Sequence, residues 1–266
     1  MLNDSSKLSS GVSAPTSVKA AKGKLPHPIA AFLVTLASFI GSSIVASIIL
    51  SLIVSTGDSG KSELFGSEIV LQFSYMLLAY GVMLGAVLVF MRWKKYSLGA
   101  VGLVRPKLKD LGLAALAFLV YIGIYIILVS FVEQLLPSID LDQKQDIGFD
   151  NAQGAALAFI FVMLVIVVPF VEEFLMRGLL FSSLRRRSSY WLAAIITSVM
   201  FAVLHLGGGE AGAGPLWIAA IDTFVLSLVL CYLRERTGRL WAGIGLHSIK
   251  NCIAFMALFI FVGSNT

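Results

Sequence analysis

Charged side chains are scarce in this chain of 266 residues. Only 13% of the residues are Asp, Glu, Lys or Arg, whereas 58% are hydrophobic. A soluble domain carries roughly twice that charged fraction. Because a backbone in the bilayer must satisfy its own hydrogen bonds, this composition admits transmembrane helices or a closed β-barrel. The apolar runs are continuous and about 20 residues long, which favours helices over the short alternating strands of a barrel.

Cysteine is also rare, and two common catalytic motifs are missing from the sequence. Cys231 and Cys252 are the two cysteines, and both lie inside apolar runs, so they indicate neither a disulfide framework nor a CxxC metal motif. The HExxH of many zinc proteases and the GxSxG of serine hydrolases do not occur. The net charge of +5 comes from basic residues scattered over several loops, without a basic and aromatic recognition motif. We therefore expect no nucleic-acid partner.

Seven apolar runs predict an all-α, polytopic transmembrane bundle of about seven spans. The predicted spans are 29–54, 69–91, 111–132, 155–180, 190–206, 215–233 and 240–263. The segments 95–105 and 135–150 leave room for an eighth element. Residues 1–28 are rich in Ser, Lys, Ala and Pro, and we expect them to form a disordered cytoplasmic tail. The first run is too long for the apolar part of a signal peptide and is expected to be an anchor.

The connections between the predicted spans alternate in charge. Basic residues gather after spans 2, 4 and 6, whereas acids dominate the segments 55–68 and 133–154. Because cytoplasmic loops carry the excess of Lys and Arg, this alternation predicts a cytoplasmic N-terminus and an external C-terminus in a cell membrane. No internal repeat or matched pair of interrupted helices is visible, which disfavours a secondary transporter.

A cluster of ionisable residues ends the fourth apolar run. Glu172, Glu173 and Arg177 lie within one and a half helical turns. Charges inside a membrane are costly and mark functional sites by default. Glu173 and Arg177 are four residues apart and are expected to pair, whereas Glu172 points about 100° away and stays available. Glu172 is therefore the candidate for chemistry, with Glu173 and Arg177 holding it in place.

Candidate partners occur in two later spans. Span 5 ends in Phe-x-x-x-His with His205, and span 7 contains His-x-x-x-Asn with His247 and Asn251. Residues 172 and 205 are equally far from the turn at Ser188, so an antiparallel hairpin brings them to one level. We expect all four groups to meet in the cytoplasmic half of the bilayer. Asp222, by contrast, is predicted to lie near the outer end of span 6, away from this cluster, in an interhelical bond.

The predicted cluster is compatible with two kinds of peptide hydrolysis. In the first, Glu172 is a general base for water, and His205, His247 and Asn251 polarise the scissile carbonyl and stabilise its oxyanion. In the second, His205 and His247, together with Glu172, hold Zn²⁺ or another divalent metal that activates the water. The histidine pair does not decide between a metal-dependent and a metal-free mechanism.

These motifs resemble those of the CAAX protease and bacteriocin-processing family, the CPBP or Abi intramembrane proteases. The order and spacing of Glu-Glu-x-x-x-Arg, Phe-x-x-x-His and His-x-x-x-Asn agree with that family, and residues 236–242 and 102–106 resemble its accessory segments. The resemblance divides the chain into the tail 1–28, two N-terminal transmembrane helices over 29–94 and a CPBP-like protease core over 95–266.

The resemblance implies an intramembrane endopeptidase that opens toward the cytoplasm and acts on a peptide or membrane-protein substrate. It assigns catalytic roles to Glu172, Glu173, Arg177, His205, His247 and Asn251. Eukaryotic members remove the last three residues of prenylated CAAX proteins. The short chain and the style of its tail favour a bacterial protein, for which we expect processing or protection that involves peptides, bacteriocins or membrane proteins. The alternative is a non-catalytic membrane protein for bacteriocin immunity or scaffolding. No oligomeric state is predicted.

Overall fold

The structure is a computed structural model that describes residues 23–55, 68–137, 149, 152–207 and 214–262. Every regular element within these residues is a helix, and six helices are long and apolar enough to cross a membrane. The predicted all-α, polytopic bundle is therefore confirmed. Each of the seven predicted spans coincides with a helix, although α8 is shorter than the other six. Residues 95–105 form turns, and most of 135–150 lies outside the described residues.

The helices follow one another along the chain in a simple order. The N-terminal pair is α1 (Pro28–Ser55) and α3 (Glu68–Trp93), and α4 (Lys109–Leu135) comes next. A continuous helix over Ala155–Arg185 contains α5 (Ala155–Val162), η1 (Met163–Val167), α6 (Val168–Glu173), η2 (Phe174–Phe181) and α7 (Ser182–Arg185). The chain ends with α8 (Tyr190–Leu204), α9 (Trp217–Thr237), α10 (Trp241–Phe255) and η3 (Met256–Val262).

Local sequence signals set several helix ends. Pro28 is the first residue of α1, where its missing N–H costs no hydrogen bond. The Ser189 hydroxyl accepts from the backbone N–H of Leu192 and caps α8. Gly238 ends α9 with a positive φ of 66°, a conformation that glycine adopts without strain. The turns before α8 and after α9 are therefore encoded locally.

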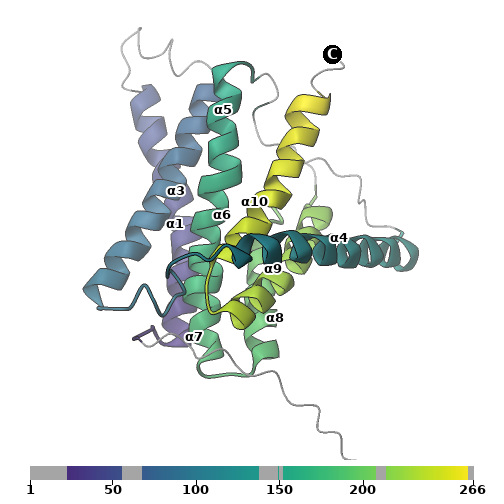
Figure 1. The fold of residues 1–266 in the computed structure, drawn as a ribbon. Coiled ribbons are helices and arrows are strands. Elements are labelled where there is room, and N and C mark those ends of the chain that lie inside the picture. The colour runs from purple at the N-terminus through teal and green to yellow at the C-terminus, as the bar shows by residue number, and fades with distance from the viewer. Residues whose placement is uncertain (1–22, 56–67, 138–148, 150–151, 208–213, 263–266) are drawn as a thin grey trace, which may run out of the picture.

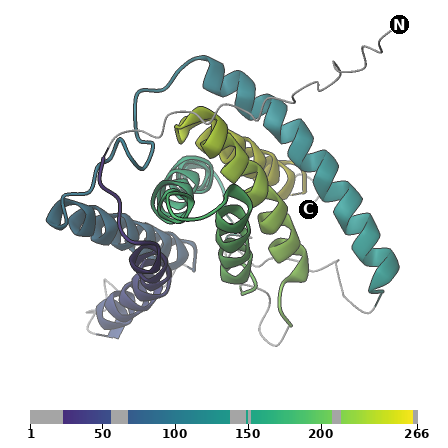
Figure 2. The same ribbon diagram turned by 90° about the horizontal axis from the view of Figure 1, so that it is seen from below.

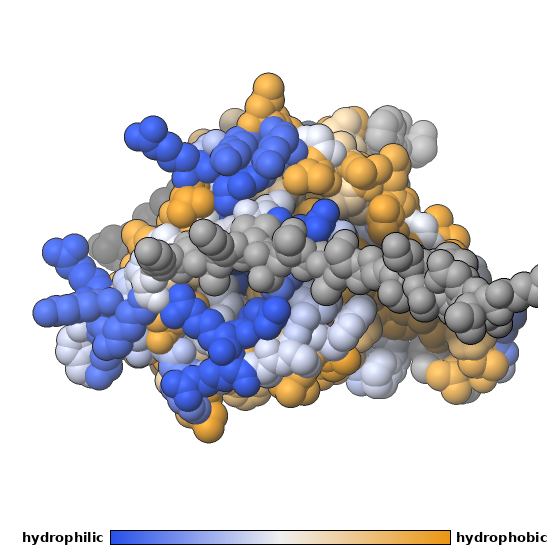
Figure 3. Space-filling view, turned by 60° about the horizontal axis from the view of Figure 1, so that its bottom comes forward, coloured by the Kyte–Doolittle hydropathy of each residue, from blue (hydrophilic) through white to orange (hydrophobic). Residues whose placement is uncertain are grey.

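The basic connections gather at one end of the bundle. Figure 1 shows the start of α1, the end of α3, α7 and the α9–α10 turn at the same end, and Figure 3 shows hydrophilic side chains gathered there. Arg185 pairs with Glu235 across this end. The two accessory segments meet here as well, because Leu240 N–H donates to the Gly102 carbonyl and Trp241 Nε1 donates to the Val104 carbonyl. This distribution is the one that the loop charges predict.

Helix α4 lies across the bundle, unlike its neighbours (Figures 1 and 2). Its buried residues include Ala114 and Ala117, and a Cβ added at Gly245 of α10 would come within 3.0 Å of the Ala114 Cβ. An ion pair of Asp110 with Arg239 ties its first turn to the start of α10. Its outer face is exposed and apolar, with Leu119 and Ile127 as examples. The start of α5 lies at the end of the bundle opposite to α7 (Figure 1), so the segment after α3 still carries the chain from one end to the other.

The N-terminal pair packs directly on the long helix. One buried cluster contains Ala31 of α1 and Met83 and Val87 of α3 together with Val171 and Leu175 of the long helix. A second cluster joins α4, α9 and α10. The N-terminal helices are thus in contact with the segment that carries the Glu172 cluster.

Candidate active site

Glu172 occupies the end of α6 and is held on both sides. Its side chain is 3% exposed. Oε1 accepts a hydrogen bond of 2.8 Å from the Tyr80 hydroxyl of α3, and Oε2 lies 3.8 Å from His247 Nε2 of α10. The carboxylate therefore has one firm donor and a second, looser neighbour. This arrangement fixes its orientation while it leaves Oε2 open to a further partner.

Glu173 and Arg177 form the expected pair deep in the protein. Arg177 Nη1 donates to Glu173 Oε1 at 2.8 Å, and both residues are completely buried. The guanidinium also lies 4.7 Å from the ring centroid of Phe201. Gly243 of α10 makes room for this pair, because a Cβ there would lie 2.9 Å from Glu173 Oε2. Neither Glu173 nor Arg177 is among the residues that line the cavity described below.

His205 follows the last residue of α8 and is oriented by its own helix. Its Nδ1 is 2.8 Å from the Phe201 carbonyl, and the two rings lie edge to face at 4.5 Å. Because a carbonyl can only accept, Nδ1 must carry the proton. In the neutral ring, Nε2 then has a free lone pair. The Phe-x-x-x-His spacing thus sets the tautomer of the histidine as well as its face.

His247 and Asn251 come from one face of α10, one turn apart. His247 lies between the two glutamates, with Nδ1 3.4 Å from Glu173 Oε1 and Nε2 facing Glu172. Asn251 Nδ2 donates to the Leu164 carbonyl at 2.8 Å. Leu164 belongs to a π-helical stretch, whose register would pair its carbonyl with the N–H of residue 169. That residue is Pro169, which has no N–H, so Asn251 supplies the missing donor.

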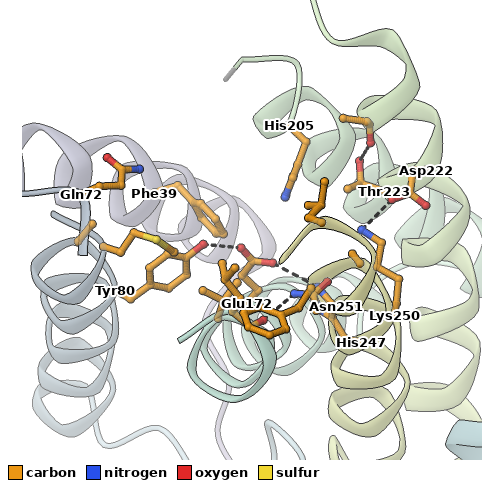
Figure 4. A pocket seen from close by; sticks show the side chains of 18 of the residues that line it. Phe39, Gln72, Tyr80, Glu172, His205, Asp222, Thr223, His247, Lys250 and Asn251 are labelled. Carbon is orange, nitrogen blue, oxygen red and sulfur yellow. Dashed lines mark hydrogen bonds and ion pairs between the residues drawn. The ribbon is translucent and has the colours of Figure 1, made fainter. Parts of the chain in front are cut away.

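A cavity of about 390 Å³ joins these groups. Figure 4 shows Tyr80 and Phe39 on one side, Asp222 and Lys250 on the other, and Glu172 between them, with a nitrogen of His205 directed into the space. The cavity wall includes Glu172, His205, His247 and Asn251, as the motif spacing predicts. The structure therefore brings together the four predicted cavity residues and places Glu173 and Arg177 behind them.

The cavity wall also contains polar residues that the motifs do not predict or that the span order misplaces. Tyr80 lies in a span with no recognised motif, and Lys250 is one of the variable positions of the His-x-x-x-Asn pattern, which assigns it no role. Asp222 was predicted to lie away from the cluster, and this is wrong, since it lines the same cavity. Its interhelical bonding is confirmed: Oδ2 pairs with Lys250 Nζ at 2.8 Å, and Oδ1 accepts from the Tyr121 hydroxyl of α4. The cavity extends from Glu172 toward α9, which span order alone did not predict.

The predicted metal ligands are not arranged as a metal centre. In the part of the chain that the structure describes, no group of three or more His, Cys, Asp or Glu side chains is placed to hold a metal ion. The free lone pair of His205 suits a metal, but each ring nitrogen of His247 faces a glutamate oxygen. A role for Zn²⁺ or another divalent ion stays a prediction, which chelation tests.

Comparison with known protein families finds a match for part of the chain. Residues 154–253 match the family described as Type II CAAX prenyl endopeptidase Rce1-like. This segment contains all three motifs, from Glu172 to Asn251. We call residues 154–253, which are similar to this family, the Rce1-like segment. The CPBP or Abi family that the motifs predict is thereby confirmed for this segment. No curated protein and no solved structure matches the chain.

The Rce1-like segment supplies most of the site but not all of it. It runs from the start of the long helix to α10 and includes Asp222 and Lys250. Phe39 of α1 and Tyr80 of α3 line the cavity, and Tyr121 of α4 donates to Asp222 on its wall. All three residues lie outside the matched segment. The helices before the Rce1-like segment therefore shape the site directly.

Proposed function

We propose that the protein is an intramembrane endopeptidase that hydrolyses a peptide bond of a membrane-associated or peptide substrate. The observation that carries the proposal is the Glu172 carboxylate on the wall of the cavity, with two histidines and an asparagine on the same wall. A buried carboxylate with a fixed orientation is suited to take a proton from water. The match of residues 154–253 to a family of endopeptidases supports the same reaction.

Glu172 Oε2 is the proposed general base. It takes one proton from a water molecule, and the water oxygen attacks the scissile carbonyl carbon. The C–N bond then breaks, and the proton on Glu172 passes to the departing amine. Tyr80 holds Oε1 throughout, so that Oε2 is the oxygen that faces the substrate. Precise placement of the base is worth orders of magnitude in rate.

The developing oxyanion needs hydrogen-bond donors. Asn251 uses one N–H for the Leu164 carbonyl and retains a second. His247 Nε2 faces Glu172 and donates a hydrogen bond when it carries the ring proton. His205 donates from Nε2 only as an imidazolium, because Nδ1 is committed to Phe201. Donors of this kind typically contribute a factor of about a hundred or more each to the rate.

Glu173 and Arg177 have a positioning role in this proposal. Their buried ion pair fixes the helical turn that carries Glu172, and Glu173 also approaches His247 Nδ1. We propose that they act through these neighbours, without contact to the substrate.

The test is cleavage of a fluorogenic peptide library by protein purified into lipid nanodiscs. Glu172→Gln is expected to abolish cleavage while the melting temperature and helix content stay those of the wild type. Product sequencing then identifies the scissile bond. If Glu172→Gln and His205→Ala both retain the cellular phenotype of the wild type, the protein acts without catalysis, as an immunity or scaffold protein would.

A further inference from the structure

Lys250 places a cation on the wall of the cavity. It lies three residues after His247 on α10, and side chains at that spacing share a helix face. Among the described residues that line the cavity, it is the only Lys or Arg. An ammonium inside a membrane protein is costly, and such groups mark ligand or substrate paths by default.

The hydrogen bonds around Lys250 leave donors for a ligand. Asp222 has a donor on each oxygen, with Lys250 on Oδ2 and Tyr121 on Oδ1. The ammonium has three N–H groups, and Asp222 is the one partner that the described residues offer it. The Lys250 side chain is also the more exposed of the two, at 25% against 15% for Asp222. Spare hydrogen-bond capacity therefore lies with the cation.

The other acidic group of the cavity is already engaged. Glu172 accepts from Tyr80 and faces His247, and it lies between Tyr80 and Lys250 (Figure 4). A peptide that places its scissile carbonyl at Glu172 thus extends its neighbouring residues toward Lys250. The group that an ammonium with free N–H donors recognises is an oxygen anion.

We propose that Lys250 binds a carboxylate of the peptide substrate close to the scissile bond. This proposal rests on the proposed function and adds a substrate class to it. The carboxylate is either the C-terminus of the peptide or the side chain of an Asp or Glu. Asp222 holds the ammonium in place between substrates and competes with the substrate carboxylate for it.

The experiment uses four fluorescent peptides of one apolar sequence. They combine a free or amidated C-terminus with Glu or Gln at one internal position. Their affinity is measured in nanodiscs of zwitterionic lipid, so that bilayer charge does not bias the result, with Glu172→Gln in the background to prevent turnover. Cleavage of the same peptides is measured without that substitution. Lys250→Met is compared with Lys94→Met, which removes an exposed Lys at the basic end of the bundle.

We expect a carboxylate to strengthen binding by roughly tenfold, the size of a charge-assisted hydrogen bond. Lys250→Met is expected to reduce this ratio to about one, whereas Lys94→Met retains it. Asp222→Asn removes the competing charge and is expected to raise the ratio. The pair of peptides that shows the preference identifies the source, C-terminus or side chain.

Two results would overturn the carboxylate site. One is equal affinity of the wild-type cavity for all four peptides, even if they are cleaved. The other is a carboxylate preference that survives Lys250→Met or falls in Asp222→Asn. A carboxylate preference that depends on Lys250, in a protein that cleaves none of the peptides, supports the site and contradicts the proposed peptidase function.

Discussion

Two carboxylates in the cavity have almost the same surroundings and different proposed roles. Glu172 accepts from Tyr80 of α3 and faces His247 of α10, whereas Asp222 accepts from Tyr121 of α4 and pairs with Lys250 of α10. The difference lies in the basic partner. The ammonium of Lys250 sits 2.8 Å from Asp222, but His247 Nε2 stays 3.8 Å from Glu172.

This comparison shows how a partner residue decides what a buried carboxylate can do. The short ion pair with Lys250 and the hydrogen bond from Tyr121 give each oxygen of Asp222 a donor. The longer distance to His247 leaves Glu172 Oε2 accessible to a further partner. Two similar triads thus divide into one suited to proton transfer and one suited to binding.

The largest expected difference between the two carboxylates is in catalysis. Glu172→Gln should lower kcat by about a hundredfold to ten-thousandfold, the usual contribution of a general base. Asp222→Asn keeps the shape of its side chain and should leave kcat within about tenfold of the wild type, with its main effect on KM. Steady-state kinetics on one peptide measure both. An equal loss of kcat in the two variants would contradict the division of roles.

The third carboxylate, Glu173, is fully buried in an ion pair with Arg177, and we expect its main contribution to be to stability. Arg177→Met leaves Glu173 buried without its cation, which typically costs about 3–5 kcal/mol. We expect a clear fall in melting temperature in nanodiscs, measured by intrinsic fluorescence. Arg105→Met, at an exposed site on the basic end, is the control and should melt like the wild type. Wild-type stability of Arg177→Met would contradict a structural role for the pair.

Tyr80 and Tyr121, the donors to Glu172 and Asp222, are expected to show smaller kinetic differences between the two carboxylates. Tyr80→Phe removes the hydrogen bond to Glu172 and keeps the ring, so kcat should fall by about fivefold to thirtyfold with KM little changed. Tyr121→Phe should change KM for carboxylate peptides and leave kcat close to the wild type. Tyr75→Phe, on another tyrosine of α3 that lines the cavity, is the matched control. A KM effect alone in Tyr80→Phe would mean that the tyrosine packs against substrate without positioning the base.

Chelation is expected to have the smallest effect. The described histidines and glutamates are not placed as a metal centre, so we expect a chelator to leave kcat within about twofold. Metal content of the purified protein, measured by mass spectrometry beside the assay, completes the test. Loss of cleavage on chelation, restored by added Zn²⁺, would assign His205 and His247 to a metal.

Much of the site could be predicted from motif spacing. Glu173 and Arg177 are four residues apart and do pair, and Phe201 and His205 at the same spacing do contact. Local periodicity is sufficient here, because residues one turn apart share a helix face. Glu172 and His205 also line one cavity, as their equal distances from the turn at Ser188 predict. A single turn separates their helices, so residue counting is enough.

The remaining site residues depend on contacts between helices that are far apart in the chain. Tyr80 and Glu172 are 92 residues apart, and Tyr121 and Asp222 are 101 residues apart. Nothing in the span of α3 marks the face that meets α6. The outer position assigned to Asp222 was reasonable for span 6 alone, but the cavity extends along α9 to meet it.

The sequence by itself determined the membrane class, the approximate helix boundaries and the candidate site residues, because hydropathy, capping and helical spacing are local properties of the chain. Only the tertiary structure decided which side chains orient Glu172 and which ones bind the two oxygens of Asp222. Those choices follow from how α3 and α4 pack against the Rce1-like segment. Helix α4 lies across the bundle, where Ala114 packs closely on Gly245 and Asp110 pairs with Arg239, and this position brings Tyr121 to Asp222.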